Sequence, residues 1–525
     1  MEFVPLAERI VDALLESSPA AALSAGDHRF DAELPDYSPD GVIAHTTMLR
    51  EASDALSQVD VDALPPAEQV DHAILMSMVE GRRFELTEVR SHEWDPLRHN
   101  PGMLLHALIA RPFAPVEQRL ESLAGRLEKI PDSLSVARGV LRDCPRIHRE
   151  TAATQFAGAA SLVRDEIPRM LAEAPALSSR VQPPADRAAQ ALTEFAQWCG
   201  AITDEGRDPR LGRRLWEAKL WHTLETELSA AEVLKRAYAT LDSATEQLRE
   251  MYGGDVRGAL DRLADSHPSN DTIIELARTT LDETTRFVRE HDLVSLVDDP
   301  CVIQEMPEFA RGVAVAYCDP PGPLETADVP TFYCIAPTPA DWTPERVRSF
   351  YREYNNHMVR NLTVHEAMPG HFLQLAHGRR YRGSSRTRNV GYSGTFVEGW
   401  AVYAEQLMVD HGFGGPAVRA QQLKMQLRMS INAILDQLVH CEDMAQADAM
   451  QLMMGRGFQE EGEAAGKWRR ALLSSTQLST YFVGFSEVSE IAAARPGNVS
   501  LKAWHDAMLA QGSRIPPPHL RSLLV

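Results

Sequence analysis

The sequence is dominated by apolar residues at helical spacing. In residues 229–252, apolar side chains recur every three or four positions, which is typical of one face of an α-helix. This segment opens with a serine, has Glu232 three residues later as in a capping box, and is followed by Gly253 as a stop signal. Similar patterns occupy most of residues 1–290 and 415–523. The sequence therefore predicts a mostly α-helical fold.

One region departs from this helical pattern. Residues 301–337 contain short runs of β-branched and aromatic residues, and Pro and Gly lie between the runs. Two of them, GVAVAYC (312–318) and TFYCI (331–335), have the composition of β-strands. We expect a small antiparallel β element near residues 301–336.

The chain shows no internal repeat and no low-complexity linker. Its Pro-Pro pairs are typical of turns within one body and not of joints between domains. We therefore expect a single continuous helical unit over residues 1–525. Its N-terminal helical half would span residues 1–296, and residues 297–525 would carry the candidate site described below.

The charge balance restricts the partners of the protein. The 525 residues include 53 Lys and Arg against 74 Asp and Glu, which gives a formal net charge of −21, and 44% of the residues are apolar. This apolar fraction is ordinary for a globular protein and excludes intrinsic disorder. The acidic surplus argues against binding to nucleic acid or to an anionic membrane surface.

The cysteine pattern and the N-terminal residues both favour a location in the cytoplasm. Six cysteines are scattered along the chain without a C-x-x-C pair, which is typical of a reduced, intracellular protein. The first residues lack a basic segment followed by a continuous apolar stretch, so no signal peptide is predicted. No run approaches the roughly 18 apolar residues that a membrane span needs. We predict a cytoplasmic protein without a membrane partner, and the oligomeric state stays open.

The segment NLTVHEAMPGHFLQ (361–374) carries candidate metal ligands. It contains His365 and His371, and Glu398 follows in a second motif, TFVEGWAVYAEQL. A zinc site needs three or so N or O ligands at about 2 Å, and a catalytic site leaves one position for water. Glu366, next to the first histidine, could take a proton from that water.

The spacing of the two histidines is unusual. In the H-E-x-x-H motif they lie four residues apart on one helical face, whereas His365 and His371 are six residues apart. On a regular helix their rings would point about 120° apart. Pro369 lacks the N–H that would bond to the His365 carbonyl, and Gly370 accepts unusual dihedral angles. We therefore expect a bulge or break there that returns His371 to the side of His365.

Two carboxylates further along the chain complete this hypothesis. Glu398 would lie at the start of a second helix packed against the first, and Glu405, two helical turns later on the same face, suits a hydrogen bond to a ligand histidine. Alternatively, the His-Glu pair arises by chance and the histidines are core residues. A carboxylate flanked by Phe396 and Trp400 is costly to bury unless it is paired or bound to metal, which favours the metal site.

The chain resembles a bacterial family catalogued as domain of unknown function 885. The resemblance is carried by HEAMPGHFLQ and FVEGWAVYAEQL and supported by DQLVH, QLSTYFVG and AWHDAMLAQGSRIPPPHL, with GDHRFDAELPD and HEWDP in the N-terminal half. That family is in turn similar to helical metallopeptidases in which an H-E-x-x-H helix is followed by a downstream Glu ligand. The resemblance implies a mostly α-helical fold with a cleft, a metal-binding helix on its floor and a short strand alongside.

The resemblance also implies roles for individual residues. His365, His371 and Glu398 match the metal ligands, and Glu366 matches the general base. The implied cofactor is one zinc ion, although this ligand set does not discriminate strongly between zinc, manganese and iron.

Two further residues are candidates for contacts to an oxyanion or a substrate. Tyr481 could stabilise a tetrahedral oxyanion, or it could be a core tyrosine. Its placement is open because the sequence has Ser475 and Thr476 where the family has a proline before this block. His440 could donate to the substrate or the oxyanion, or it could be a structural histidine within a helix.

Three more residues are candidates for substrate binding. Arg380 and Arg382 belong to the Arg-rich loop GRRYRGSSRTRNVG, which could bind a substrate carboxylate or form a solvated surface. Tyr317 lies in GVAVAYC, whose edge could accept an extended substrate as an added strand or be covered by its neighbours. Strand register would decide whether Tyr317 faces the cleft.

These features together predict a zinc-dependent hydrolase that cleaves an amide bond in short peptides or small amides. Glu366 would deprotonate the attacking water and return the proton to the leaving amine, while Tyr481, with or without His440, would stabilise the oxyanion. Two alternatives stay open. One is an enzyme of a specialised pathway that catalyses deacylation, elimination or cyclisation of a small molecule, and the other is a non-catalytic binding protein with a degenerate metal motif.

Overall fold

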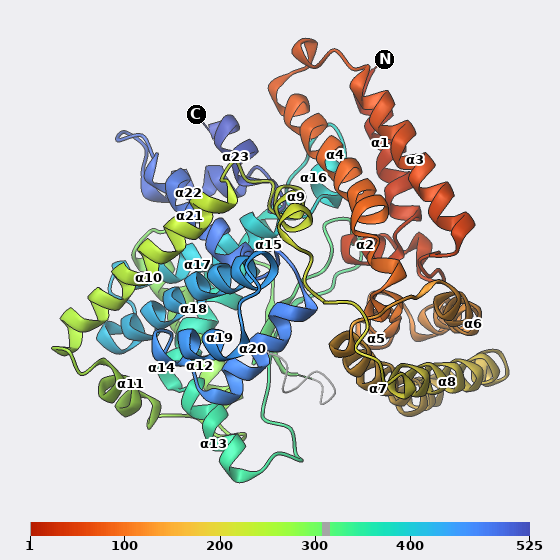
Figure 1. The fold of residues 1–525 in the computed structure, drawn as a ribbon. Coiled ribbons are helices and arrows are strands. Elements are labelled where there is room, and N and C mark those ends of the chain that lie inside the picture. The colour runs from red at the N-terminus through yellow and green to blue at the C-terminus, as the bar shows by residue number, and fades with distance from the viewer. Residues whose placement is uncertain (1, 307–314, 525) are drawn as a thin grey trace. The chain divides into compact units, whose positions relative to one another are not determined.

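The structure, a computed structural model, describes residues 2–306 and 315–524 (Figure 1). These residues form a mostly α-helical fold with one small β-sheet, which confirms the predicted fold class. They group into two compact units. The first unit comprises Met1–Pro209, Pro321–Val329 and Gly383–Val390, and the second comprises Arg210–Pro320, Pro330–Arg382 and Gly391–Val525.

The main division therefore falls near residue 210, not near residue 297 where two halves were expected to meet. Helices between residues 213 and 290 belong with the C-terminal part because α10 (Ala230–Tyr252) packs along α18 (Gly415–Cys441), and α12 (Ile273–Glu290) packs on α14 (Asn356–Glu366). The expectation of one continuous body over residues 1–525 stays a prediction.

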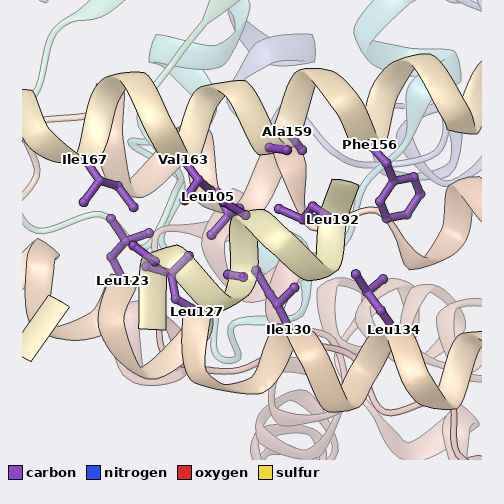
Figure 2. Close-up of a cluster of buried hydrophobic side chains, with 14 of the residues drawn as sticks. Leu105, Leu123, Leu127, Ile130, Leu134, Phe156, Ala159, Val163, Ile167 and Leu192 are labelled. Carbon is purple, nitrogen blue, oxygen red and sulfur yellow. The ribbon is translucent and has the colours of Figure 1, made fainter. Parts of the chain in front are cut away.

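The first unit is built from helices whose apolar faces form two cores. In one of them, Leu127 and Ile130 of α6 share a buried cluster with Val163 and Ile167 of α7 and Leu192 of α8 (Figure 2). The helices of this unit are α1 (Phe3–Glu16), α2 (Pro19–Ala25), α3 (Pro39–Ser57), α4 (Pro66–Phe84), α5 (Gly102–Ala110), α6 (Val116–Val140), α7 (Arg146–Glu173), α8 (Ser178–Ala201) and α16 (Thr387–Val390). Short 3-10 helices lie at His28–Phe30 (η1), Val61–Ala63 (η2), Ser91–Glu93 (η4), Pro96–His99 (η5) and Pro175–Leu177 (η6), and a π-helical turn at Glu85–Val89 (η3).

Ion pairs hold the two later segments within the first unit. The Arg388 Nε donates to Asp71 at 2.6 Å with both side chains buried, and the Ser385 hydroxyl donates to the same carboxylate. In the other segment, Glu325 lies 2.8 Å from the His28 Nε2. Part of the Arg-rich loop is therefore structural, because a buried arginine paired with a buried carboxylate is costly to disrupt.

The second unit surrounds the long, almost fully buried helix α18. Helix α10 begins as its sequence predicts, since the Ser229 hydroxyl accepts from the Glu232 N–H at 3.2 Å, and Gly253 ends it at a φ of 61°. The remaining helices of this unit are α9 (Arg213–Leu224), α11 (Val256–Ala264), α13 (Pro344–Glu353), α15 (His371–Gly378), α17 (Gly394–Asp410), α19 (Gln446–Gly455), α20 (Glu461–Leu473), α21 (Thr480–Ala493), α22 (Leu501–Leu509) and α23 (Pro517–Leu524).

The small sheet has three strands in the order β1-β3-β2. As predicted, β2 (Ala316–Asp319) runs antiparallel to β3 (Thr331–Ile335), but β1 (Cys301–Glu305) runs parallel to β3. The sheet is mixed because β3 inserts between the two strands that precede it in the chain. Residues 312–314 of the run GVAVAYC lie outside the described residues. No helix in the described part of the chain combines the length and apolar character that crossing a bilayer needs.

Candidate metal centre

A break between two helices brings the histidines together. Helix α14 ends at Glu366 and α15 begins at His371, with a cis peptide bond before Pro369 between them. The Gly370 N–H donates to the Val364 carbonyl at 2.9 Å, and a Cβ at Gly370 would lie 1.9 Å from the His365 carbonyl oxygen. Only glycine fits this path of the chain. The structure therefore contains the helix break expected at Pro369 and Gly370.

The three candidate ligands converge at this break. The Glu398 Oε2 lies 3.4 Å from the His365 Nε2 and 3.5 Å from the His371 Nε2. The three ligand atoms all lie within 4.8 Å of one another. Two ligand atoms at about 2.1 Å from a tetrahedral zinc ion are separated by about 3.4 Å. The distances from Glu398 to both imidazoles match that separation, so the residues present fit one metal ion.

The polar atoms of this cluster lack ordinary partners. The Glu398 Oε2 and the His371 Nδ1 are both buried, and neither makes a hydrogen bond to any residue the structure describes. Burying a carboxylate oxygen is costly, and among the described residues only the imidazoles of His365 and His371 lie close enough to offset that cost. A cation held between the carboxylate and the two imidazoles would compensate that cost.

The electrostatics of the cluster are strongly coupled. Burial raises the pKa of Glu398, but the imidazoles of His365 and His371 outweigh burial and hold it well below the usual range of a carboxyl. Burial lowers the pKa of His365, but Glu398 and Glu405 outweigh burial and raise it well above its usual value. Glu398 is therefore ionised, as a metal ligand must be, whereas His365 would have to release a proton before its Nε2 could bind a cation.

Glu405 orients the first ligand. The His365 Nδ1 donates to Glu405 at 2.7 Å, so its Nε2 is left to face Glu398. The second oxygen of Glu405 accepts from the Asn361 Nδ2 at 2.6 Å. Asn361 was not predicted as part of the site, although it lies one helical turn before His365, the spacing at which side chains share a face.

Glu366 adjoins a candidate ligand in the chain, and the Tyr481 hydroxyl is affected by the charges of two carboxylates of the site. Glu366 is buried at the end of α14, next to His365. The Glu398 carboxylate, burial and, more weakly, the Glu366 carboxylate raise the pKa of Tyr481 to about 12. Arg470 Nη2 donates to this hydroxyl at 3.4 Å.

The turn before Tyr481 is held by a residue that the sequence analysis missed. The buried carboxylate of Asp436, on α18, accepts from the N–H groups of Thr476 and Ser479 at 2.9 and 3.0 Å. It also accepts from the Trp216 Nε1 at 3.0 Å. These bonds fix a turn in which Thr476 has a φ of 64° in place of the expected proline. Asp436 belongs to the DQLVH motif, which was the available signal.

The structure does not bring His440 to the ligand cluster. Its Nδ1 accepts from the Leu211 N–H at 3.2 Å, and its Nε2 donates to the carbonyls of Ala471 and Ser474 at 2.9 and 2.8 Å. Both ring nitrogens are therefore used by the backbone. The hypothesis that His440 donates to a substrate is corrected, and this histidine is structural.

The three residues expected to bind substrate are held by local contacts. Arg380 donates to the Ala376 carbonyl at 2.7 Å and pairs with Asp299, and Arg382 donates to the carbonyls of residues 379 and 381. Tyr317, on β2, packs against the small apolar cluster of Met306, Cys334 and Ala336. Substrate binding by these three residues stays a prediction.

The fold and the site define a helical protein with a candidate mononuclear metal centre of two histidines and one glutamate. The chain belongs to the family described as "Bacterial protein of unknown function (DUF885)", which matches residues 19–524. No curated protein is significantly similar to it in sequence.

Solved structures share this fold over the whole chain. A candidate lipoprotein of unknown function from Shewanella oneidensis is 28% identical, with a TM-score of 0.84 over 100% of this chain and 99% of that chain. A candidate lipoprotein from Colwellia psychrerythraea is 16% identical, with a TM-score of 0.81 over 99% of this chain and 97% of that one. The M32 carboxypeptidase from Deinococcus radiodurans R1 is 14% identical over 92% and 90% of the two chains, with a TM-score of 0.33, which is too low to show a shared fold.

The predicted cytoplasmic location is contradicted by the 28% identical relative from Shewanella oneidensis, which is described as a candidate lipoprotein. One basis of that prediction was that the scattered cysteines indicate a reducing compartment. In the structure Cys144, Cys199 and Cys334 are buried as free thiols. Burial raises the pKa of Cys199 to about 12, and a buried thiol of this kind is unreactive whatever the redox compartment.

Proposed function

We propose that this protein is a metal-dependent hydrolase that cleaves an amide bond in a short peptide or a small amide. The observation that carries the proposal is the convergence of His365, His371 and Glu398 to within 4.8 Å around a buried carboxylate oxygen that no described residue hydrogen-bonds. Such a ligand set is typical of catalytic zinc sites, which keep one coordination position open.

The proposal assigns each part of the reaction to one group. Zinc, when bound by the three ligands, would act as a Lewis acid that activates water and polarises the substrate carbonyl. Glu366 would accept the proton of the attacking water and deliver it to the leaving amine. Tyr481 would donate a hydrogen bond to the oxyanion. Its pKa of about 12 means that the hydroxyl keeps its proton at neutral pH.

The proposal is tested with purified protein loaded with zinc and a library of dipeptides and N-acyl amino acids. In Glu366→Gln the turnover should fall by at least about 100-fold, the usual loss when a general base is removed. One zinc ion per chain should still bind, because all three ligands remain. A matched control is Glu275→Gln, which changes an exposed carboxylate on α12 of the same unit and should leave turnover unchanged.

Two outcomes would contradict the proposal. Full zinc occupancy without hydrolysis of any library member would rule out a peptidase or amidase of this substrate range. Equal turnover in Glu366→Gln and the wild type would show that Glu366 is not the base.

A further inference from the structure

A cavity of about 580 Å³ lies within the first unit. Residues of α2, α3, α4, α5 and α6 line it, so it belongs to one compact unit and not to the candidate metal centre. Its volume is in the range of small-molecule binding sites. Neither the fold nor the proposed hydrolysis explains it.

Arg82 is an unusual residue in the wall of this cavity. Its Nη1 donates to the Leu14 carbonyl at 2.7 Å, and no carboxylate among the described residues forms an ion pair with it. Burial lowers the pKa of Arg82 to about 10. A largely buried cation without a counter-charge is costly. The next residue, Arg83, is exposed and pairs with Glu80 at 2.5 Å, so the lack of a partner is specific to Arg82.

His45, on α3, faces the same cavity. Its Nε2 is buried and has no hydrogen-bond partner among the residues described. Burial, together with the charge of Arg82, lowers the pKa of His45 to about 4. The imidazole is therefore neutral at physiological pH, and its Nε2 can carry a hydrogen that has no acceptor in the protein.

The rest of the wall defines what else a ligand must offer. The charged side chains in the cavity wall are three arginines, Arg82, Arg98 and Arg111, and two carboxylates, Asp36 and Glu85. The wall therefore carries one net positive charge, whereas the whole protein has a formal net charge of −21. The uncharged part of the wall is mixed. Its apolar side chains include Leu23, Leu34, Leu86, Leu104, Ile130 and Leu134, and its polar ones include Ser17, Ser18, Ser24, Tyr37, Asn100 and Ser133. A small inorganic anion would satisfy the charge but would leave this apolar surface uncovered.

We propose that this cavity binds an amphipathic carboxylic acid as its monoanion. The carboxylate pairs with the Arg82 guanidinium, whose planar array of N–H groups matches two carboxylate oxygens, and it accepts a hydrogen bond from the His45 Nε2. The apolar part of the ligand lies against the leucines of α2, α5 and α6. This site is independent of the metal centre and of the proposed hydrolysis.

The probe for this site is decanoate, kept below its micellar concentration and titrated into the full chain by isothermal calorimetry. We expect saturable binding of one decanoate per chain. Arg82→Gln should weaken binding at least about tenfold, since a charge-assisted bidentate pair is lost. Arg83→Gln is the matched control and should bind as the wild type does. Decanol, which has the same chain and no charge, should bind at least about tenfold more weakly.

A second variant tests the site in case Arg82→Gln does not fold. Ala107→Phe keeps Arg82 and fills part of the cavity from α5, so it should also weaken decanoate binding, with a melting curve close to that of the wild type. The absence of saturable binding would overturn the proposal. Equal affinities for decanol and decanoate, or undiminished binding in both Arg82→Gln and Ala107→Phe, would also overturn it, because they would show attachment to apolar surface elsewhere.

Discussion

Asp436 and Arg470 determine where the Tyr481 hydroxyl lies. Asp436 fixes the turn before α21 through the N–H groups of Thr476 and Ser479 and through the Ser479 hydroxyl. Arg470 binds the hydroxyl itself, and two of its nitrogens also donate to Gln477. Tyr481 is therefore held at both its backbone and its side chain, as a residue that must meet a short-lived oxyanion should be.

The first prediction concerns this hydroxyl. In Tyr481→Phe the kcat for peptide hydrolysis should fall about 100-fold, the usual effect of removing one oxyanion donor, with little change in KM. Steady-state kinetics of the wild type and the variant measure both kcat and KM. Tyr238→Phe, on a partly exposed tyrosine of α10 in the same unit, is the control. An unchanged kcat in Tyr481→Phe would show that the hydroxyl does not contact the transition state.

Some of these residues could be predicted from the sequence and others could not. His365, His371, Glu398 and Glu405 stand in two motifs whose residue types suggested a metal site, although the six-residue spacing of the histidines required a break in the helix. Asp436 could not be assigned, because its partners are distant in the chain: Thr476 and Ser479 lie about 40 residues later, and Trp216 lies 220 residues earlier. His440 was misassigned for the same reason, since its backbone partners come from other segments.

At the scale of elements, the break between α14 and α15 is the feature on which the metal centre depends. The Trp400 Nε1, from α17, donates to the Pro369 carbonyl at 2.8 Å, and the Gln374 Nε2 donates to the Phe396 carbonyl at 3.1 Å. The helix that carries Glu398 therefore also binds the chain on both sides of His371. The packing of α17 against this break therefore places Glu398 and His371 at the same time.

The second prediction tests this arrangement. Gly370→Ala would place a Cβ 1.9 Å from the His365 carbonyl oxygen, so the break must change and the ligands should separate. We expect zinc binding, measured by competition with a chromogenic chelator, to weaken at least about tenfold. The control Gly466→Ala adds a methyl group that meets nothing within 4 Å on helix α20. Retention of full zinc affinity in Gly370→Ala would contradict the described geometry.

The third prediction concerns the segment Pro321–Val329 in the first unit. Burial lowers the pKa of His28, but hydrogen bonds with Asp31 and Glu325 outweigh burial and raise it above its usual value. His28 therefore adds stability that is fully present below about pH 6.5, the pKa of an unfolded histidine, and is lost as pH rises through the raised pKa. The stability difference between the wild type and His28→Gln should shrink with rising pH.

Urea unfolding between pH 5.5 and 8.5 measures this difference. His291→Gln, at an exposed histidine after α12, is the control and should show no comparable trend. A difference for His28→Gln that stays constant or grows with pH would contradict the assignment of its two carboxylate partners.

The sheet shows why element order is harder to predict than element type. The run TFYCI matches β3, so the local composition identified the strand correctly. The parallel pairing of β1 with β3 could not be predicted, because the composition of a strand does not determine which other strand it pairs with.

At the scale of the whole molecule, the sequence was enough to predict the fold class. It was not enough to predict which segments, distant in the sequence, belong to the same compact unit. Amphipathic periodicity identified the helices, since burial of one face recurs every turn. This periodicity does not show that residues 383–390 belong to the first unit, although the segments before and after them belong to the second. That assignment depends on single buried pairs such as Arg388 with Asp71, which carry no sequence pattern.

The fourth prediction follows from the placement of all three ligands in the second unit. Zinc should slow hydrogen exchange in α14, α15 and α17, because a ligand that binds only the folded state stabilises it by about 2.7 kcal/mol at 100 times its Kd. The first unit, which contains none of the three candidate metal ligands, should exchange at an unchanged rate. Exchange mass spectrometry with and without zinc measures both, and His371→Ala should abolish the effect. Protection confined to the first unit would contradict the assignment.

The central claim is that His365, His371 and Glu398 hold one metal ion. The most direct test is a crystal structure with anomalous diffraction data recorded on both sides of the zinc absorption edge. We predict a single peak about 2.1 Å from the Nε2 atoms of both histidines and from a Glu398 oxygen. Density that shows the three side chains turned away from one another, or an anomalous peak bound only by other residues, would contradict the claim.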